Sequence, residues 1–264
     1  MKRIMLGMAV VCSLAGLPWT GEGQGYIGPE KVPYGAGRPL EIMGDRLRVT
    51  GKERLDLVGV LTRAGQDPVG VRILWEFPGK VRLEKRLEGE GADPAKRDVL
   101  VYDGAGNLRK RGGTAALADQ DLIEMLVYDT VEGFFIGQIE GFATRFLGSR
   151  YHKVDEDGNP VGPDYDIYEV VNQVRVPGRP LRQRKLYYFD SDTALLGQVR
   201  YRLAAERGRG PVEVTVEVSG WGEAFGQLIP TLTVRYEDRV EVVRLEISEV
   251  GVAAASEDGS FTLD

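Results

Sequence analysis

The sequence is poor in the residues that most often carry catalysis. Its 264 residues include one cysteine, Cys12, and one histidine, His152. Because Cys12 lies in an apolar run near the N-terminus, the rest of the chain has no thiol, which excludes disulfide bonds, thiolate nucleophiles and cysteine metal sites there. No later apolar run approaches the roughly 20 residues of a membrane-spanning helix. The net charge of −6 gives no attraction to phosphate backbones, so we expect no nucleic-acid partner.

The N-terminus has the pattern of a secretory signal peptide. Lys2 and Arg3 are followed by an apolar run over residues 4–11, and small residues continue as far as Gly25. The apolar run is too short to span a bilayer stably. We therefore expect residues 1–25 to be a signal peptide, with several small residues that could precede the cleavage site, and the mature chain to be exported.

Cys12 leaves two interpretations open. It could be the lipid-attachment cysteine of an exported lipoprotein, but such cysteines normally follow a small residue, and Val11 precedes this one. Otherwise it is removed with the signal peptide, and the mature protein has neither a thiol nor a lipid anchor. The sequence favours the second interpretation.

Alternation of apolar and polar residues predicts strands along most of the chain. Residues 212–218, with the sequence VEVTVEV, would have one buried and one solvated face, and residues 240–250 show a similar pattern. Turn pairs such as Pro78-Gly79 and Asp103-Gly104 favour hairpins between neighbouring strands. Further strands are predicted at residues 55–62, 69–77, 80–87, 98–102, 107–110, 150–154, 166–176, 184–189, 195–203 and 228–236.

Residues 114–147 have helical periodicity instead. They contain no proline, and apolar residues recur at i, i+4, i+7 and i+11 from Phe135 to Phe146. This pattern predicts one long helix or two short ones, with Asp119 as the N-cap. Gly133, Gly137 and Gly141 lie four residues apart, which would let either the sheet or a ligand approach closely.

Together these patterns predict an α+β fold. About a dozen strands and a central helical segment indicate a single large curved antiparallel sheet, with helices packed in its concave face. Residues 38–50 could form a further short helix. Residues 26–39 are rich in glycine and proline without periodicity, which predicts a mobile linker. Residues 40–264 would then form one domain.

Catalytic and metal sites find little support in the sequence. His152 lies in a predicted strand, and no spacing joins it to Ser149 and an acid as a catalytic triad. Residues 155–159 (DEDGN) are similar to the start of a calcium loop, but Pro160 stands where the sharp-turn glycine belongs, which favours a solvated hairpin turn. The sequence has no phosphate-binding loop and no zinc-ligand spacing. We therefore expect no enzyme activity, no cofactor and no metal.

Six short motifs occur in an order that is known from one group of proteins. They are residues 57–61 (LVGVL), 75–82 (WEFPGKVR), 101–104 (VYDG), 186–196 (LYYFDSDTALL), 226–230 (GQLIP) and 245–250 (LEISEV). Over residues 40–263 the chain resembles the outer-membrane lipoprotein-carrier superfamily, the LolA/LolB-like periplasmic proteins, in a divergent form. The resemblance implies a half-barrel of about eleven strands closed by helices. It also implies a hydrophobic cavity for lipoprotein acyl chains. A protein of this family takes these chains from an inner-membrane transporter and delivers them to the outer membrane.

The leading hypothesis is a periplasmic, non-catalytic carrier that holds a lipid or a lipidated protein between sheet and helix. Its partners would be an acyl chain or a lipoprotein and a component of the inner or outer membrane. Burying one long acyl chain would contribute on the order of 10 kcal/mol, at about 0.8 kcal/mol per methylene, before ordering costs. The alternative is a structural or protein-interaction module of the cell envelope, in which the same face is a filled core. The predicted apolar wall consists of Trp75, Phe77, Phe135, Ile139, Phe142 and Phe146.

Overall fold

The computed structural model describes residues 53–76, 79–85, 98–139, 144–177, 182–204, 210–254 and 261. The predicted signal peptide, the linker and the short helix at residues 38–50 lie outside this part of the chain. Two of the six predicted wall residues, Phe77 and Phe142, also lie outside it, as do the side chains of Ile139 and His152.

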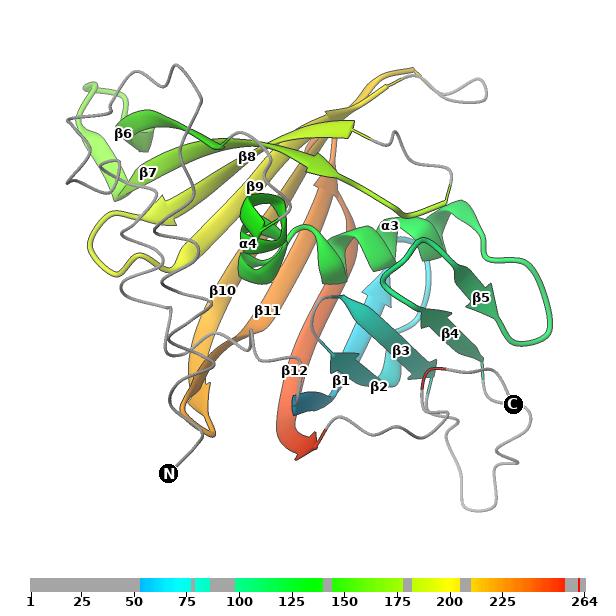
Figure 1. Ribbon diagram of the computed structural model, residues 1–264. Coiled ribbons are helices and arrows are strands. Elements are labelled where there is room, and N and C mark those ends of the chain that lie inside the picture. Colours follow the sequence, from blue (N-terminus) through cyan, green and yellow to red (C-terminus); the bar gives the residue numbers. More distant parts are fainter. Residues whose placement is uncertain are drawn as a thin grey trace.

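The described residues form one open sheet of twelve strands, in which all neighbours are antiparallel (Figure 1). Across the sheet the order is β5-β4-β3-β2-β1-β12-β11-β10-β9-β8-β7-β6. The strands are β1 (Glu53–Arg63), β2 (Val69–Glu76), β3 (Lys80–Lys85), β4 (Val99–Tyr102), β5 (Leu108–Lys110), β6 (Thr144–Val154), β7 (Pro160–Gln173), β8 (Arg182–Asp190), β9 (Leu196–Leu203), β10 (Val212–Ala224), β11 (Gln227–Glu237) and β12 (Val240–Ala254).

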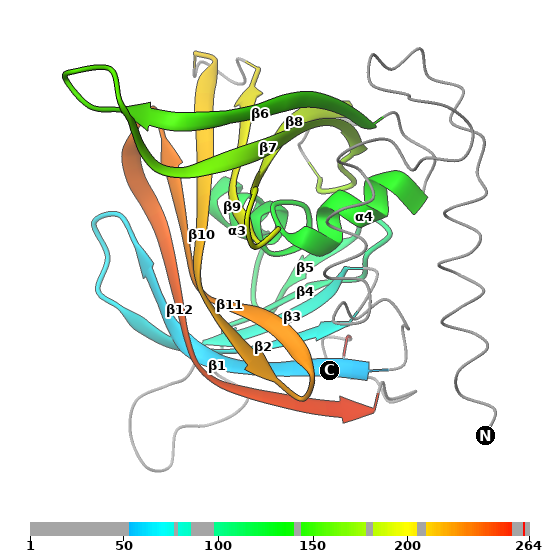
Figure 2. The ribbon, with the colours of Figure 1, turned by 90° about the vertical axis from the view of Figure 1, so that its left-hand side faces the viewer.

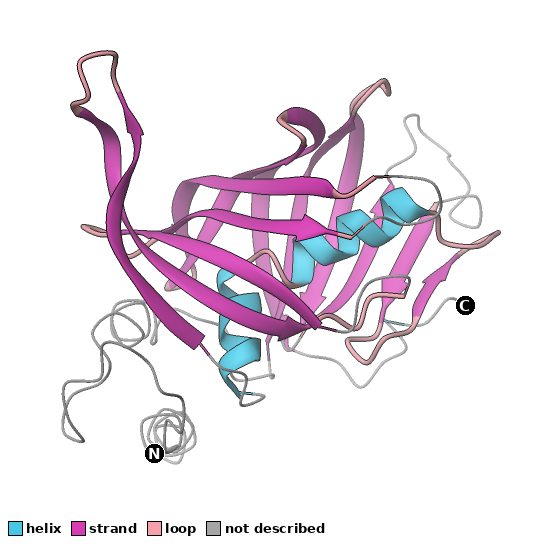
Figure 3. Cartoon of the chain, turned by 90° about the horizontal axis from the view of Figure 1, so that it is seen from above, coloured by secondary structure: helices cyan, strands magenta, loops and turns pink. Residues whose placement is uncertain are grey.

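Two helices connect the two edges of this sheet. The chain runs from β1 near the centre to β5 at one edge, and it resumes with β6 at the opposite edge. Between them lie α3 (Leu117–Val127) and α4 (Val131–Ile139). The helical segment must therefore cross the sheet, and the helices lie on the side toward which the sheet bends (Figures 2 and 3).

The core lies between the helices and one face of the sheet. In β10 the side chains of Val212, Val214, Val216 and Val218 are all buried, and the residues between them are more exposed. They share one hydrophobic cluster with helix residues such as Leu122. Each fully buried aliphatic side chain of this size contributes about 1.5–3 kcal/mol, so burial of this face stabilises the fold.

A close approach between β1 and β12 requires a glycine. The pairing of these strands shifts between Val58 and Gly59, and a Cβ atom on Gly59 would lie only 2.1 Å from the carbonyl oxygen of Glu246. Such bulges increase the local bend of a sheet. The shift therefore helps the central strands to curve.

The predicted α+β fold with a curved antiparallel half-barrel is confirmed. Each strand predicted from the sequence overlaps a strand of the structure, and there are twelve strands where the resemblance implied about eleven. The helical segment consists of two helices, one of the two arrangements that the sequence left open. Asp119 is the third residue of α3, and the N-cap is Ala116, so the predicted N-cap was wrong.

The predicted end of the helical segment was also wrong. Residues 144–147 belong to strand β6, so Phe146 lies on a strand and not on a helix. Its ring packs against Tyr168 of β7, with ring centroids 5.3 Å apart. Strand pairing with β7 supplies hydrogen bonds and an apolar neighbour at the sheet edge, and this long-range contact outweighs the local helical spacing.

No described helix is long and apolar enough to cross a membrane.

Candidate functional site

A pocket opens where strands β11 and β12 separate. Their ladder ends at the pair Leu232 and Glu246, and β12 continues alongside β1. The ladder between β9 and β10 ends at Gln198 and Glu217. In the described strands, residues 220–231 thus pair only between β10 and β11. We name residues 220–231 the hairpin arm. It leaves the main sheet and turns away from the line of the two strands (Figure 2).

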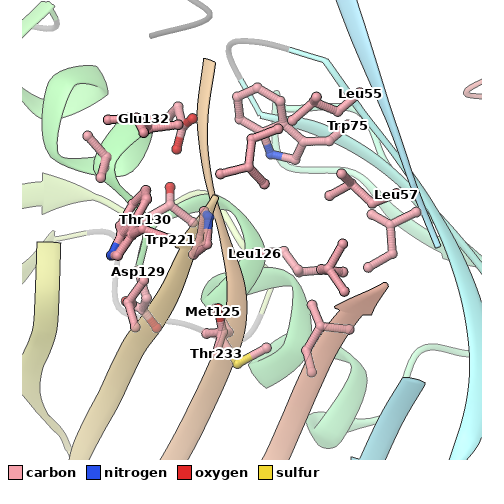
Figure 4. Close-up of a pocket in the computed structure, with 18 residues that line it drawn as sticks. Leu55, Leu57, Trp75, Met125, Leu126, Asp129, Thr130, Glu132, Trp221 and Thr233 are labelled. Atoms are coloured by element: carbon pink, nitrogen blue, oxygen red, sulfur yellow. The ribbon is translucent and has the colours of Figure 1, made fainter. Parts of the chain in front are cut away.

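Three parts of the chain form the walls of this pocket (Figure 4). Strands β1, β2 and β12 form one wall, the hairpin arm forms the second, and the junction between α3 and α4 forms the third. The apolar lining residues are Leu55, Leu57, Ile73, Trp75, Leu245 and Ile247 from the strands, Trp221, Leu228, Ile229 and Pro230 from the arm, Val218 beside it, and Met125, Leu126 and Val131 from the helices.

The pocket is small and has few polar groups. The cavity volume is about 80 Å³, well above the roughly 10–15 Å³ that one water molecule requires. The polar lining residues are Asp129, Thr130, Glu132 and Thr233. Thr130 accepts a hydrogen bond from the Gly133 amide at 3.1 Å and donates to the Val127 carbonyl at 3.3 Å, so it serves the helix junction. The pocket therefore offers mainly apolar contact.

A buried cluster of charged side chains lies beside the pocket. Lys185 on β8 donates to Glu124 Oε1 at 2.9 Å and to Asp129 Oδ1 at 2.5 Å, and none of these three side chains has exposed surface. Arg235 on β11 donates to Asp121 Oδ1 at 2.9 Å. Glu124 and Asp121 lie on α3, and Asp129 lies between the two helices. The cluster therefore fixes the helix junction, which is one wall of the pocket, to the sheet.

Two further groups complete this charged cluster. The Tyr201 hydroxyl donates to Asp129 Oδ2 at 3.0 Å and accepts from Arg235 at 2.7 Å, and Glu237 Oε1 accepts from Arg235 at 3.2 Å. Among these described contacts, four carboxyl groups and two basic side chains have a formal charge of −2. Burial raises the pKa of Asp129, although Lys185 acts to lower it.

Tyrosine hydroxyls hold the same junction by neutral hydrogen bonds. The Tyr187 hydroxyl donates to the backbone carbonyl of Tyr128 at 2.6 Å. The Tyr128 hydroxyl accepts from the amide of Arg175 at 3.1 Å and lies 3.2 Å from the Tyr102 hydroxyl. Burial raises the pKa of the Tyr102 hydroxyl, which keeps it neutral. The helix junction is therefore held from both halves of the sheet.

The structure places the six predicted wall residues in different surroundings. Trp75 lines the pocket. Phe135 is buried in the core against Phe134, with ring centroids 5.2 Å apart, and is not among the lining residues. Phe146 packs against Tyr168 on the edge strands. Phe77, Phe142 and the side chain of Ile139 lie outside the described residues.

Sequence reasoning missed the hairpin arm and the charged cluster. The arm had a signal in its Gly220-Trp221-Gly222 segment and in Pro230 inside a predicted strand, since glycine and proline mark irregular strand positions. The charged cluster had a signal in Lys185. This residue lies on the same strand face as Tyr187, so the alternation places a charged side chain on the buried face. The sequence had no signal for the contact between these two regions and the helices.

Ser149 and Asp155, which the sequence analysis considered for a catalytic triad and a calcium loop, have structural roles in the described strands and turns. Ser149 donates to Asp166 Oδ1 at 2.5 Å across the β6–β7 pair. Asp155 accepts from the amides of Asp157 and Asn159 at 3.0 and 2.7 Å, which is the predicted hairpin turn. Within the described ranges, no group of three or more histidine, cysteine or acidic residues is arranged to hold a metal ion.

Solved structures of other proteins share this architecture. A LolA superfamily protein from Nitrosomonas europaea is similar over 86% of this chain and 97% of its own, with a TM-score of 0.53 and 13% identity. The fold is therefore of the LolA type, as the order of motifs implied. Two further structures overlap less well. One is an outer-membrane lipoprotein-sorting protein domain from Vibrio parahaemolyticus (TM-score 0.44, 12% identity, 84% of this chain and 95% of that one). The other is a DUF1329 family protein from Desulfovibrio piger (TM-score 0.45, 14% identity, 81% of this chain and 90% of that one). No family model and no curated protein matches the sequence.

Proposed function

We propose that this protein is a non-catalytic binding protein of the periplasm that holds an acyl chain of a lipid or of a lipidated protein in the pocket beside the hairpin arm. The observation that carries the proposal is the pocket itself, an apolar space at the one place where the arm leaves the described main sheet. Concave apolar surfaces with few polar groups are what acyl chains require.

The LolA-type fold supports a role in lipoprotein traffic toward the outer membrane. The basic and apolar N-terminus supports export. In this proposal residues 1–25 are the signal peptide, residues 26–39 are a linker and residues 40–264 are the binding domain. A component of the inner or outer membrane would supply or accept the ligand.

The size of the pocket sets the expected affinity. A pocket of this size takes part of an acyl chain, and about five buried methylenes would contribute roughly 4 kcal/mol, at about 0.8 kcal/mol per methylene before ordering costs. A binding free energy of about 4 kcal/mol gives a millimolar dissociation constant, and one of about 8 kcal/mol gives a micromolar constant. We therefore expect reversible binding of part of a chain, which suits a protein that must release its ligand.

Tryptophan fluorescence tests this proposal directly. Trp75 and Trp221 both line the pocket, and the third tryptophan, Trp19, lies in the predicted signal peptide. The fluorescence of the mature protein therefore reports on the pocket alone. A long-chain fatty acid that carries bromine atoms should quench it saturably, whereas brominated butyrate should not. No quenching, together with no co-purifying lipid in native mass spectrometry, would contradict the proposal.

A matched pair of variants locates the binding. Leu228 lines the pocket and is only partly buried, so Leu228→Lys places a charge in the wall with modest strain. We expect fatty-acid affinity to fall about tenfold or more, equal to about 1.4 kcal/mol. Val240 is 62% exposed at the first position of β12, and Val240→Lys should leave the affinity unchanged.

The second candidate function, a protein-interaction module with a filled core, also has a specific observation in its favour. Phe134 packs edge-on against Phe135, Tyr168, Tyr187 and Phe189, with ring centroids 5.0–5.5 Å apart. The face next to α4 is thus occupied by protein side chains. If this function is correct, lipid probes will not quench the tryptophans, and partners captured in pull-downs will remain after lipid is stripped.

A further inference from the structure

The tip of the hairpin arm holds a bulky residue in a strained backbone position. Ala224 pairs with Gln227, so Phe225 and Gly226 form a two-residue turn. Their φ angles are +54° and +74°, which is the type I′ geometry that asparagine, aspartate and glycine adopt with least strain. A phenylalanine is unfavourable at this position because its Cβ atom opposes the left-handed conformation.

Burial of the side chain does not compensate for this strain. The Phe225 side chain is 68% exposed, more than any other large apolar side chain in the described part of the chain. Strained backbone positions often occur at functional sites. The aromatic ring is therefore better explained by a contact outside this chain than by the stability of the turn.

The tip adjoins the pocket. Leu228, a lining residue, pairs with Glu223, which is one residue pair from the turn. Trp221 and Ile229 continue the same wall toward the base of the arm. At that base Gly220 has a φ angle of +66°, and a Cβ atom there would lie 2.3 Å from Thr231 Oγ1. The bend at Gly220 therefore needs glycine, and it carries the tip away from the main sheet.

The chemistry of the arm indicates which partner would fit. Residues 220–231 (GWGEAFGQLIPT) contain one charged residue, Glu223. A nearly uncharged arm does not match an acidic or basic macromolecule, whereas phenylalanine and leucine side chains are among those that interfacial segments bury at the boundary between the headgroups and the acyl chains of a bilayer. A zwitterionic lipid surface therefore fits the tip best.

We infer that Phe225 inserts into the surface of a lipid bilayer and brings the open end of the pocket to the acyl chains that it takes up or releases. This inference rests on the proposed function, since the pocket would otherwise have no lipid to exchange. One aromatic side chain gives weak and reversible membrane contact. Such contact suits a protein that visits a membrane and leaves it again.

The substitution Phe225→Asn separates the role of the ring from that of the turn. Asparagine relieves the strain at a positive φ angle, so the urea midpoint of unfolding should stay the same or rise. The rate at which the mature protein takes up a fluorescent fatty acid from phosphatidylcholine vesicles should fall about tenfold. Its equilibrium affinity for the same fatty acid in solution should change by less than about twofold.

Two matched variants serve as controls. Phe225→Trp keeps an aromatic ring at the tip, so uptake should stay near the wild-type rate, and the added fluorescence should shift to the blue when vesicles are present. Val240→Asn changes an exposed apolar residue at the start of β12, next to the turn that joins β11 to β12, and should leave uptake unchanged.

The outcomes distinguish this inference from the proposed function. If wild-type protein binds no fatty acid in solution, the proposed function fails, and flotation of wild type and Phe225→Asn with phosphatidylcholine vesicles still tests the membrane contact. Equal flotation, or equal uptake rates, would overturn the inference. If the tip contacts a partner protein instead of lipid, wild type and Phe225→Asn will likewise show equal flotation and equal uptake rates.

Discussion

Lys185 Nζ lies 2.5 Å from Asp129 Oδ1, and neither side chain has exposed surface. This pair joins the middle of β8 to the junction of α3 and α4, and Asp129 also lines the pocket. Two buried charges lose much of their hydration, so the pair adds little net stability over apolar residues, but removal of one partner leaves the other uncompensated. The position of the pocket wall therefore depends on the pair remaining intact.

The substitution Lys185→Met should destabilise the protein strongly. It removes the cation that donates to both Asp129 and Glu124 and leaves Asp129 with the more distant Arg235, whose Nη1 lies 3.8 Å from Asp129 Oδ2. The free energy of unfolding should fall by about 3–5 kcal/mol in urea denaturation at pH 7. Arg184 is its neighbour on β8 with a side chain that is 70% exposed. Arg184→Met should change the free energy by about 0.5 kcal/mol or less. Similar effects of the two substitutions would show that the buried pair is not critical.

Asp119 should make stability depend on acid pH. Burial acts to raise its pKa, but hydrogen bonds from the Ala116 amide, Lys110 and Arg63 outweigh burial and lower it. The folded protein thus holds the carboxylate more strongly than the unfolded chain, whose pKa is about 3.9. The added stability is fully present above that value and is lost as pH falls through the lowered folded pKa.

The substitution Asp119→Asn tests this pH dependence. At pH 7 it should cost about 1–3 kcal/mol of unfolding free energy, because three partners lose a charged acceptor. The difference from wild type should shrink as the pH is lowered from about 4. Asp67 is exposed in the β1–β2 turn, and Asp67→Asn should have little effect throughout. A difference that is constant with pH would refute the assigned role of the carboxylate.

Gly133 should resist substitution because of the chain that precedes it. A Cβ atom at this position would lie 2.5 Å from the backbone oxygen of Tyr128. Gly133→Ala must displace the junction of the helices, so we expect a loss of about 1–3 kcal/mol despite the better helix propensity of alanine. Gly113 has no atom within 4 Å of the same position, and Gly113→Ala should be neutral or slightly stabilising in the same denaturation experiment.

The strands were predictable because each has one buried and one solvent-exposed face. In residues 212–218 burial follows the alternation of apolar and polar residues directly. The start of β6 was not predictable in this way. Phe142 and Phe146 lie four residues apart, and a spacing of four places side chains on one face of a strand as well as on one face of a helix. Only the pairing of β6 with β7 distinguishes the two.

The pocket was largely beyond the reach of sequence reasoning. It exists because the residues of β11 that precede Leu232 do not pair with β12, and that choice of partner depends on residues far apart in the chain. Trp75 and Leu228 share the pocket although they lie far apart in the sequence. Local periodicity could place apolar residues on a buried face, but it could not show which part of that face is filled by α4.

The substitutions Trp75→Leu and Phe135→Leu should separate the pocket from the core. Both side chains are buried aromatics, so each substitution should lower the free energy of unfolding by about 1–3 kcal/mol. Trp75 lines the pocket and Phe135 does not, so only Trp75→Leu should weaken the binding of a fluorescent fatty acid, by about fivefold or more. The emission of the probe is the proper readout, because Trp75→Leu removes one of the two tryptophans in the pocket. If Phe135→Leu weakens binding equally, the acyl chain reaches α4, and the wall predicted from the sequence is part of the site.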